Sequence, residues 1–283
     1  MASLLCETVT GDTMTQLLAA RDTAAADAGV DMLELRLDGV ADLDVAGALH
    51  GRRVPVIATC RPTWEGGRFD GSEETRRRVL EQALEAGADY VDVEWKAFQQ
   101  AQGGARFDNL VQANRSRVVL SSHDFTGVPT DLCTRAGAMR ATGAAVIKVA
   151  VTASRLSDTL PLRELAKQGD AVVIGMGDAG VPSRLLATRF GSRWTYGGNG
   201  VAPGQIPAAR MIDEFRFRAI TEQTSVYGLA GAAVLTSTIP ARRNAAFAAA
   251  GVDAVCVPLP AADPADIQTF ADALGIIGWE RCM

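Results

Sequence analysis

A single lysine lies in the middle of an apolar stretch of the chain. Residues 143–152 read GAAVIKVAVT, and Lys148 is the only charged residue among them. Desolvation disfavours an ammonium group in an apolar strand, so the lysine needs a chemical or structural reason to be there. A buried lysine flanked by other cations loses its proton more easily, and the neutral amine can attack a carbonyl and form a Schiff base. The segment therefore indicates lysine-imine chemistry.

Imine chemistry needs a base, because a protonated imine acidifies the neighbouring carbon. The chain has two histidines, and His50 in GALHGRR is expected to lie on the surface. His123, in SSHDF, follows an apolar run and is the candidate base. Glu65 could orient its imidazole and favour the tautomer that accepts a proton.

Three arginines, Arg36, Arg61 and Arg184, indicate an anionic, oxygen-rich substrate. The residues alone thus predict lysine-imine chemistry on a keto acid. They leave aldol cleavage and elimination both open.

Short apolar runs alternate with helix-period segments along the first 220 residues. The runs are 3–9, 31–37, 54–60, 89–95, 117–123, 144–151, 171–176 and 193–198. Eight strand–helix units that close on themselves form a (β/α)₈ TIM barrel, which is the expected fold. A doubly wound open sheet is the structural alternative.

Barrel enzymes build their active sites at the carboxyl ends of the strands. Polar or pocket-forming candidates lie at or just after the predicted strand ends, with Lys148 within its strand. They are Glu34, Arg36, Arg61, Glu65, His123, Lys148, Met176, Arg184 and Gln205. Each has an ordinary explanation when taken alone, such as a structural ion pair between Glu34 and Arg36. Their convergence on one end of one barrel favours a site.

The glycine-rich segment GMGDAG, residues 175–180, matches the pattern G-x-G-x-x-G. A dinucleotide site also needs an acidic residue about 20 positions further on, where this chain has YGGNGVA. We therefore interpret the segment as a tight loop between a barrel strand and its helix.

The pattern changes after residue 222. Apolar runs at 225–231 and 253–259 alternate with helical segments at 239–251 and 263–274, and the segment GIIGW at 275–279 ends the series. The expected organisation is a barrel over 1–222 and a small α/β appendage over 223–283.

Composition excludes several classes of protein. The chain of 283 residues is 48% hydrophobic and carries a net charge of −5 without a basic stripe, so nucleic acid is not an expected partner. No apolar run is long enough for a membrane span. The five cysteines are widely spaced and odd in number, which indicates reduced thiols and, with no leader pattern at the start, a cytoplasmic location. No metal-binding cluster is evident, and neither metal nor cofactor is expected.

In an ordered set of segments the chain resembles the type I 3-dehydroquinate dehydratases. The matching segments are LELRLD (33–38), ATCRPTWEGG (58–67), VDVEW (91–95), SSHDF (121–125), IKVAV (147–151), GVPSR (180–184), FGS (190–192) and APGQ (202–205). The resemblance covers residues 3 to about 220, and it implies a barrel that acts without metal or cofactor and commonly forms a homodimer.

The resemblance also implies a role for each candidate. Lys148 would form an imine with the ketone of 3-dehydroquinate, and His123, oriented by Glu65, would remove the adjacent proton and later protonate the leaving hydroxyl. Loss of water gives 3-dehydroshikimate, a step of aromatic amino acid biosynthesis. The remaining residues would bind substrate: Glu34, Arg36 and Arg61 the ring hydroxyls, Arg184 and Gln205 the carboxylate, and Met176 the pocket wall.

The appendage resembles the opening part of a shikimate dehydrogenase, from VYGLAG to the second strand of that family. Ser237 matches one of two substrate-binding serines and Ile239 replaces the other, and the chain ends before the catalytic lysine and the nicotinamide domain. We expect no dehydrogenase activity. Two alternatives to the dehydratase are a different Schiff-base barrel, such as a class I aldolase, and a non-catalytic barrel that binds a quinate-type ligand.

Overall fold

The computed structural model describes residues 2–100 and 106–282. Eight strands form one sheet in the order β7-β6-β5-β4-β3-β2-β1-β8. Their bounds are β1 Leu4–Val9, β2 Met32–Arg36, β3 Val56–Thr59, β4 Tyr90–Glu94, β5 Val118–Asp124, β6 Val146–Thr152, β7 Ala171–Met176 and β8 Trp194–Gly197. Each predicted run contains one of these strands, apart from shifts of one or two residues at the ends.

Backbone hydrogen bonds join the two ends of the strand order. Leu4 N, at the start of β1, donates to Arg193 O at 3.0 Å, and Arg193 N donates to Ala171 O of β7 at 2.9 Å. The segment before β8 therefore bonds both β1 and β7, which closes the sheet into a ring. The predicted (β/α)₈ barrel is confirmed.

The strand register decides which side chains share a face of the sheet. In the parallel pairs, Thr8 of β1 lies opposite Glu34 of β2, and Thr59 of β3 lies opposite Asp92 of β4. Paired residues of neighbouring strands point to the same side, and successive residues alternate. This alternation brings polar side chains of β1 to β4 into the interior of the barrel.

Helices and 3₁₀ turns follow the strands. The α-helices of the barrel are α1 Met14–Ala24, α2 Val45–Leu49, α3 Glu73–Glu85, α4 Trp95–Gln99, α5 Phe107–Ala113, α6 Leu132–Ala141, α7 Leu160–Ala166, α8 Val181–Leu185, α9 Ala187–Phe190 and α10 Ala208–Asp213. The start of α3 is typical: the Ser72 side chain accepts from Thr75 N, and Glu73 and Glu74 occupy the first turn. Both features stabilise a helix N-terminus.

Residue contacts divide the chain into two compact units. The first unit comprises Cys6–His123 and Asp131–Lys148. The second unit comprises Met1–Leu5, Asp124–Thr130 and Val149–Met283. Each unit is described by itself below.

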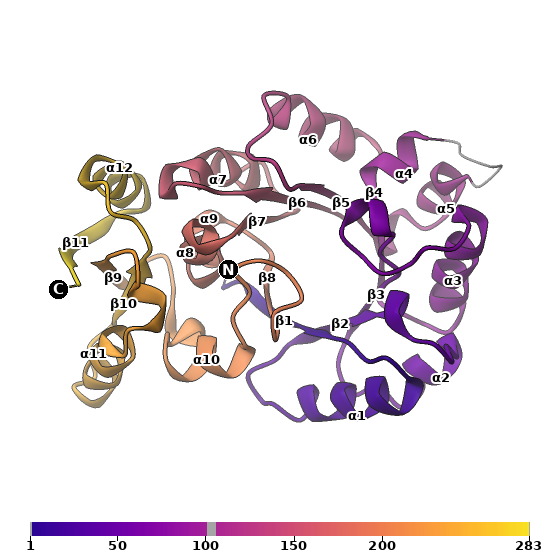
Figure 1. Ribbon diagram of the computed structural model, residues 1–283, viewed down its shortest axis with the longest axis horizontal. Helices are drawn as coiled ribbons and strands as arrows, with labels where there is room; N and C mark the ends of the chain where they lie inside the picture. Colours follow the sequence, from indigo (N-terminus) through magenta and orange to yellow (C-terminus); the bar gives the residue numbers. More distant parts are fainter. Residues whose placement is uncertain (1, 101–105, 283) are drawn as a thin grey trace. The chain divides into compact units, whose positions relative to one another are not determined.

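The second unit contains the predicted appendage as a parallel three-stranded sheet (Figure 1). Its strands are β9 Ser225–Ala230, β10 Ala254–Leu259 and β11 Ile276–Arg281, in the order β10-β9-β11. The helices are α11 Ile239–Ala249 and α12 Pro264–Leu274. Strands β9 and β10 and both helices correspond to the segments expected from the sequence pattern, whereas GIIGW, expected only as an apolar end, begins the third strand β11.

Helix α12 packs on the 3₁₀ turn η4, Leu156–Thr159, within the second unit. The carboxylate of Asp266 accepts from Leu156 N at 2.9 Å and from Ser157 N at 3.1 Å. The rings of Phe270 and Phe190 lie 6.4 Å apart. Buried polar and aromatic contacts therefore attach the appendage to the residues after β6 and β7.

A membrane-spanning helix is absent from the part of the chain that the structure describes, because no helix there is both long and apolar enough.

Candidate active site

Lys148 lies in the middle of β6, and its ammonium is buried between two carboxylates. The Lys148 Nζ atom is 3.2 Å from Glu34 Oε1 and 3.3 Å from Asp92 Oδ2. All three residues are at most 5% exposed. The sequence had suggested a lysine flanked by cations, and this expectation is wrong for its immediate neighbours. Charge compensation by two carboxylates makes the burial of the ammonium tolerable.

Glu34 is held in place by hydroxyl groups from both neighbouring strands. Thr8 Oγ1 donates to Glu34 Oε2 at 3.1 Å, and Thr59 Oγ1 donates to Oε1 at 3.0 Å. Burial works to raise the pKa of Glu34, but the charges of Lys148 and Arg36 leave it below its ordinary value. Glu34 is therefore an ionised, fixed partner of the lysine.

Asp92, on β4, joins the lysine to an arginine. Its carboxylate accepts from Ser121 Oγ at 2.5 Å and pairs with Arg61 Nη2 at 2.9 Å. Burial works to raise the pKa of Asp92, but the positive charges of Arg61 and Lys148 outweigh it and hold this pKa well below its usual range. Three strands, β4, β5 and β6, and the segment after β3 thus meet at one carboxylate.

His123, near the end of β5, forms a dyad with Glu65. Glu65 Oε1 lies 3.1 Å from the ring Nδ1 of His123 and accepts from its backbone N at 3.0 Å. An ionised carboxylate only accepts, so in this pair Nδ1 carries the proton and Nε2 is the ring nitrogen with the lone pair. Burial first, and then the charges of Arg61 and Lys148, lower the pKa of His123 well below its ordinary value. The imidazole is therefore neutral and suited to act as a base.

A tight turn places Glu65 against this imidazole. Glu65 ends the 3₁₀ turn η2, Thr63–Glu65, and Gly66 follows in the left-handed conformation with φ 75°. A Cβ atom on Gly67 would lie 2.0 Å from the carbonyl oxygen of Arg61, so the backbone passes where only glycine fits. The two glycines after Glu65 return the chain beneath Arg61 and fix the carboxylate beside β5.

Arg61 and Arg36, both predicted to bind substrate, differ in their partners. Besides Asp92, Arg61 donates to Glu94 Oε1 at 2.7 Å. Arg36 makes a bidentate pair with Asp38 at 2.8 and 2.7 Å. The guanidinium of Arg36 is thus neutralised by Asp38, two residues away. The ordinary explanation offered for Arg36, a structural ion pair with Glu34, is therefore not what the structure shows.

Sequence reasoning did not assign Asp92 and Glu94. Both lie in the VDVEW segment, two residues apart on an apolar strand. Residues two apart on a strand point to the same face, so this alternation could have pointed to Asp92 and Glu94.

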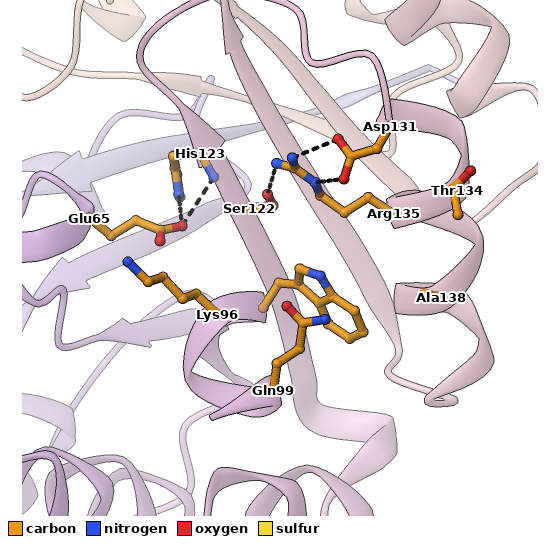
Figure 2. A pocket seen from close by; sticks show the side chains of 10 residues that line it. Glu65, Lys96, Gln99, Ser122, His123, Asp131, Thr134, Arg135 and Ala138 are labelled. Atoms are coloured by element: carbon orange, nitrogen blue, oxygen red, sulfur yellow. Dashed lines mark hydrogen bonds and ion pairs between the residues drawn. The ribbon is translucent and has the colours of Figure 1, made fainter. Parts of the chain in front are cut away.

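A pocket of about 400 Å³ in the first unit reaches the dyad from the side of α4 and α6 (Figure 2). His123, Glu65 and Ser122 line it together with residues of those helices. Figure 2 shows Lys96, from α4, pointing toward Glu65. Its positive charge opposes the burial that raises the pKa of Glu65.

The three remaining candidates belong to the second unit. Met176 is buried at the end of β7, and Arg184 is buried in α8 with 2% exposure. Arg184 Nη2 donates to Pro203 O at 3.2 Å, while its buried Nε has no partner among the described residues. Burial lowers the pKa of Arg184 to about 10. A buried, incompletely bonded guanidinium is suited to receive an anion.

Gln205 organises the loop after β8. Its Oε1 accepts from Val201 N at 3.0 Å and from Ala202 N at 3.1 Å, and its Nε2 donates to Gly197 O at 2.9 Å. These contacts give the side chain a structural role in addition to the substrate contact expected from the sequence.

The GMGDAG segment forms the loop between β7 and α8, including the 3₁₀ turn η5, Asp178–Gly180. A Cβ atom on Gly180 would come within 2.2 Å of the carbonyl carbon of Gly175. The glycines therefore serve a close approach of two backbone segments.

The fold and the site together define a class of protein: a (β/α)₈ barrel enzyme with a buried lysine and a neutral histidine that is paired with a carboxylate. Among the described residues, no group of three or more His, Cys, Asp or Glu side chains is placed to hold a metal ion. Comparison with known proteins narrows the class. The model of the type I 3-dehydroquinase family matches residues 5–222, so the chain belongs to that family and is a lyase of the shikimate pathway.

Individual relatives agree with this assignment. The chain is 33% identical over 269 residues to the bifunctional 3-dehydroquinate dehydratase/shikimate dehydrogenase, chloroplastic, of Arabidopsis thaliana. That match covers 91% of this chain and 44% of the relative, so the chain spans less than half of that protein. It is 37% identical over 190 residues to the 3-dehydroquinate dehydratase of Methanothermobacter thermautotrophicus, covering 64% of this chain and 82% of the relative.

A solved structure shares the architecture. The 3-dehydroquinate dehydratase of Geobacillus kaustophilus HTA426 aligns with a TM-score of 0.65 at 25% identity, covering 75% of this chain and 89% of that one.

Proposed function

We propose that this protein converts 3-dehydroquinate to 3-dehydroshikimate, with Lys148 forming the imine and His123 moving the proton. One observation carries the assignment of roles. The first unit holds a buried lysine, paired with Glu34 and Asp92, and a neutral His123 on the neighbouring strand, paired with Glu65 of the turn η2. Family membership supports the substrate and the reaction.

The first chemical step joins Lys148 to the ring ketone. The ammonium gives up one proton, and its nitrogen forms a bond to the carbonyl carbon. This proton and a second one from the nitrogen pass to the carbonyl oxygen, which leaves as water when the C–O bond breaks. The product is a protonated imine that keeps one positive charge. Glu34 and Asp92, which balance the ammonium before the reaction, can balance this iminium as well.

The second step uses the imidazole of His123. Its Nε2 removes the proton from the carbon next to the iminium, and the electron pair of that C–H bond moves toward nitrogen. The same imidazolium then gives its proton to the neighbouring hydroxyl, which leaves as water. Glu65 stabilises the imidazolium between these transfers through Nδ1. Hydrolysis of the imine frees the lysine.

The remaining candidates are proposed to bind substrate. Arg61, Arg36 and Glu34 offer charged groups to the ring hydroxyls. Arg184, whose buried Nε has no partner among the described residues, is proposed to hold the carboxylate with help from Gln205. Met176 is proposed to line the wall of the pocket.

The test is turnover of 3-dehydroquinate, followed by the ultraviolet absorbance of the conjugated product. Lys148→Ala should abolish turnover, whereas His123→Ala should keep imine formation and lose most of the turnover. If wild-type protein leaves 3-dehydroquinate unchanged but binds it without a covalent adduct, the protein is a non-catalytic binder. Cleavage of a carbon–carbon bond would instead indicate an aldolase.

For the appendage, residues 223–283, we propose no dehydrogenase activity. Ile239 stands where the resembling family has a substrate-binding serine, and it begins α11. Oxidation of shikimate by the purified protein with a nicotinamide cofactor would contradict this proposal.

We also propose a cytoplasmic homodimer. The five cysteines are all free in the structure, which suits a reducing compartment, and the family resemblance supports the dimer. Light scattering after size-exclusion chromatography measures the mass, and a monomer at micromolar concentration would contradict the dimer.

A further inference from the structure

Arg76 is a fully buried arginine outside the set of residues assigned to substrate. It lies on α3 with no exposed surface, and its guanidinium lies 4.4 Å from the ring centroid of Phe107 and 5.8 Å from that of Trp64. A helix residue that only stabilised the surface would be exposed, as its neighbours Arg77 and Arg78 are in part. The burial of this charge needs another explanation.

Arg76 and Arg61 share one carboxylate, Glu94. Glu94 Oε1 accepts from Arg61 Nη1 at 2.7 Å, and Glu94 Oε2 accepts from Arg76 Nη1. The other edge of the Arg76 guanidinium pairs with Glu73 at 2.6 Å. Arg76 on helix α3 thus pairs with Glu94, and Glu94 in turn pairs with Arg61, whose other partner is Asp92.

We infer that Arg76 is a positioning residue for the substrate-binding guanidinium of Arg61, acting through Glu94. The inference rests on the proposed function, because Arg61 is assigned to substrate there. The ion-paired carboxylate fixes one edge of Arg61, while Asp92 fixes Nη2. Without Glu94 in its ionised form, Arg61 would keep its ion pair with Asp92 and its hydrogen bond to Ser121 but would lose the second carboxylate that fixes its guanidinium.

The charge of Glu94 depends on both arginines. The charged groups that face it are Arg61 after β3, Arg76 on α3, Asp92 on its own strand and Glu65 in η2. Burial raises the pKa of Glu94, Arg61 and Arg76 oppose the rise, and the two acidic groups add to it. Removing Arg76 takes away one opposing charge, so Glu94 would bind a proton at a higher pH than in the wild type.

The experiment compares the KM and kcat of Arg76→Met with those of wild type between pH 6 and 9. In the wild type the pKa of Glu94 is raised to about 7 by burial, so the charge of Glu94 differs most between the two proteins above that pH. The expected result is a KM for 3-dehydroquinate about tenfold higher at about pH 7.5–8.5, a kcat within about threefold, and an intact Lys148 adduct. The KM difference should shrink toward pH 6, where Glu94 is protonated in both proteins. Arg76→Lys should restore KM in part, because it keeps a cation beside Glu94.

Arg77→Met is the matched control. Arg77 is the next residue of α3 and pairs with Glu74 at 2.8 Å and with Glu81 at the surface. No contact joins Arg77 to Glu94 among the described residues. The KM of Arg77→Met should therefore stay within twofold of wild type at every pH. A purely structural role for Arg76 would lower the melting temperature but leave the KM ratio independent of pH.

A double-variant cycle tests the route through Glu94 and does not depend on Arg76→Met folding well. Glu94→Gln should raise KM, and adding Arg76→Met to it should raise KM no further. The double variant removes both buried charges and leaves neither unpaired. A further rise in KM on adding Arg76→Met, or a wild-type KM in folded Arg76→Met at about pH 7.5–8.5, would overturn the inference. No turnover by the wild type would instead contradict the proposed function.

Discussion

The charge on Lys148 is balanced by residues that are far away in sequence. Glu34 lies 114 positions before it and Asp92 lies 56 positions before it, yet both are within 3.3 Å of its nitrogen. An isolated ammonium in an apolar strand would cost several kcal/mol, and two carboxylates offset that cost. The same carboxylates provide a negative environment in which an iminium can form.

The lowered pKa of His123 gives a prediction for the pH dependence of the reaction. A base works in its neutral form, and the neutral form of His123 persists below the ordinary histidine pKa of 6.5. Single-turnover rates should therefore stay level as the pH falls from 8 through 6.5 and decline only at lower pH. A decline centred at pH 6.5 or above would show that the pKa of His123 is not lowered, or that another group limits the rate.

At the residue scale, the sequence offered nine candidates for the site. They stand out because Lys148 interrupts an apolar run and residues such as His123 follow one. The Lys148–Asp92 pair and the shared Glu94 were not found, because their importance comes from contacts across three strands. Those contacts depend on the register and closure of the barrel, which apolar periodicity does not specify.

At the scale of elements, the eight strands were predictable for a physical reason. Parallel strands buried on both faces read as continuous apolar runs, as β7 does with all six residues buried. The short helices and 3₁₀ turns were not predicted with this accuracy. A helix as short as α9, with four residues, is too short to show a helical repeat of apolar residues. The turn that places Glu65 depends instead on two glycines.

The loop between β7 and α8 offers a test of glycine packing. Gly180→Ala would put a Cβ atom 2.2 Å from the Gly175 carbonyl carbon, and backbone cannot yield as a side chain can. We expect a loss of about 1–3 kcal/mol in the free energy of unfolding, as for overpacked cores. Chemical denaturation with urea measures it.

Gly137→Ala is the control for this loop. Gly137 lies inside α6, and nothing comes within 4 Å of an added Cβ atom. That change should raise the stability by about 0.5–1 kcal/mol, the ordinary gain of alanine over glycine in a helix. Equal effects of the two substitutions would contradict the packing argument.

For the molecule as a whole, the appendage is bonded to the barrel residues of the second unit. Besides Asp266, Arg189 in α9 donates to Thr224 O and to Leu274 O, the latter at 3.3 Å. The sequence predicted four of the five elements of the appendage but not these contacts. An arginine at a helix end and an aspartate near a helix start have many possible partners. Removal of residues 223–283 would expose Phe190 and leave Leu156 N without its acceptor.

The Asp266 contact can be tested by itself. Asp266→Ala should lower the free energy of unfolding by about 1–3 kcal/mol, because two backbone N–H groups of η4 lose a buried acceptor. Asp272→Ala, on the same helix with its carboxylate bonded to Gln268 at the surface, should change the free energy of unfolding by less than about 0.5 kcal/mol.

The pH dependence of this contact has a definite sign. Burial opposes ionisation of Asp266, but hydrogen bonds from Ser157 and Leu156 leave its pKa below the ordinary value of 3.8. A lowered carboxyl pKa stabilises the fold above the unfolded-state pKa, and this stabilisation is lost as the pH falls through the folded-state pKa. The difference in free energy of unfolding between wild type and Asp266→Ala should therefore narrow below about pH 4. A difference that stays constant down to pH 2 would contradict the role of the ionised carboxylate.

The most direct test of the whole account is the mass of the protein after reduction with borohydride in the presence of 3-dehydroquinate. The account predicts a covalent adduct that maps to the peptide containing Lys148, present in His123→Ala and absent in Lys148→Ala. Turnover of the substrate without any adduct, or an adduct on another lysine, would contradict it.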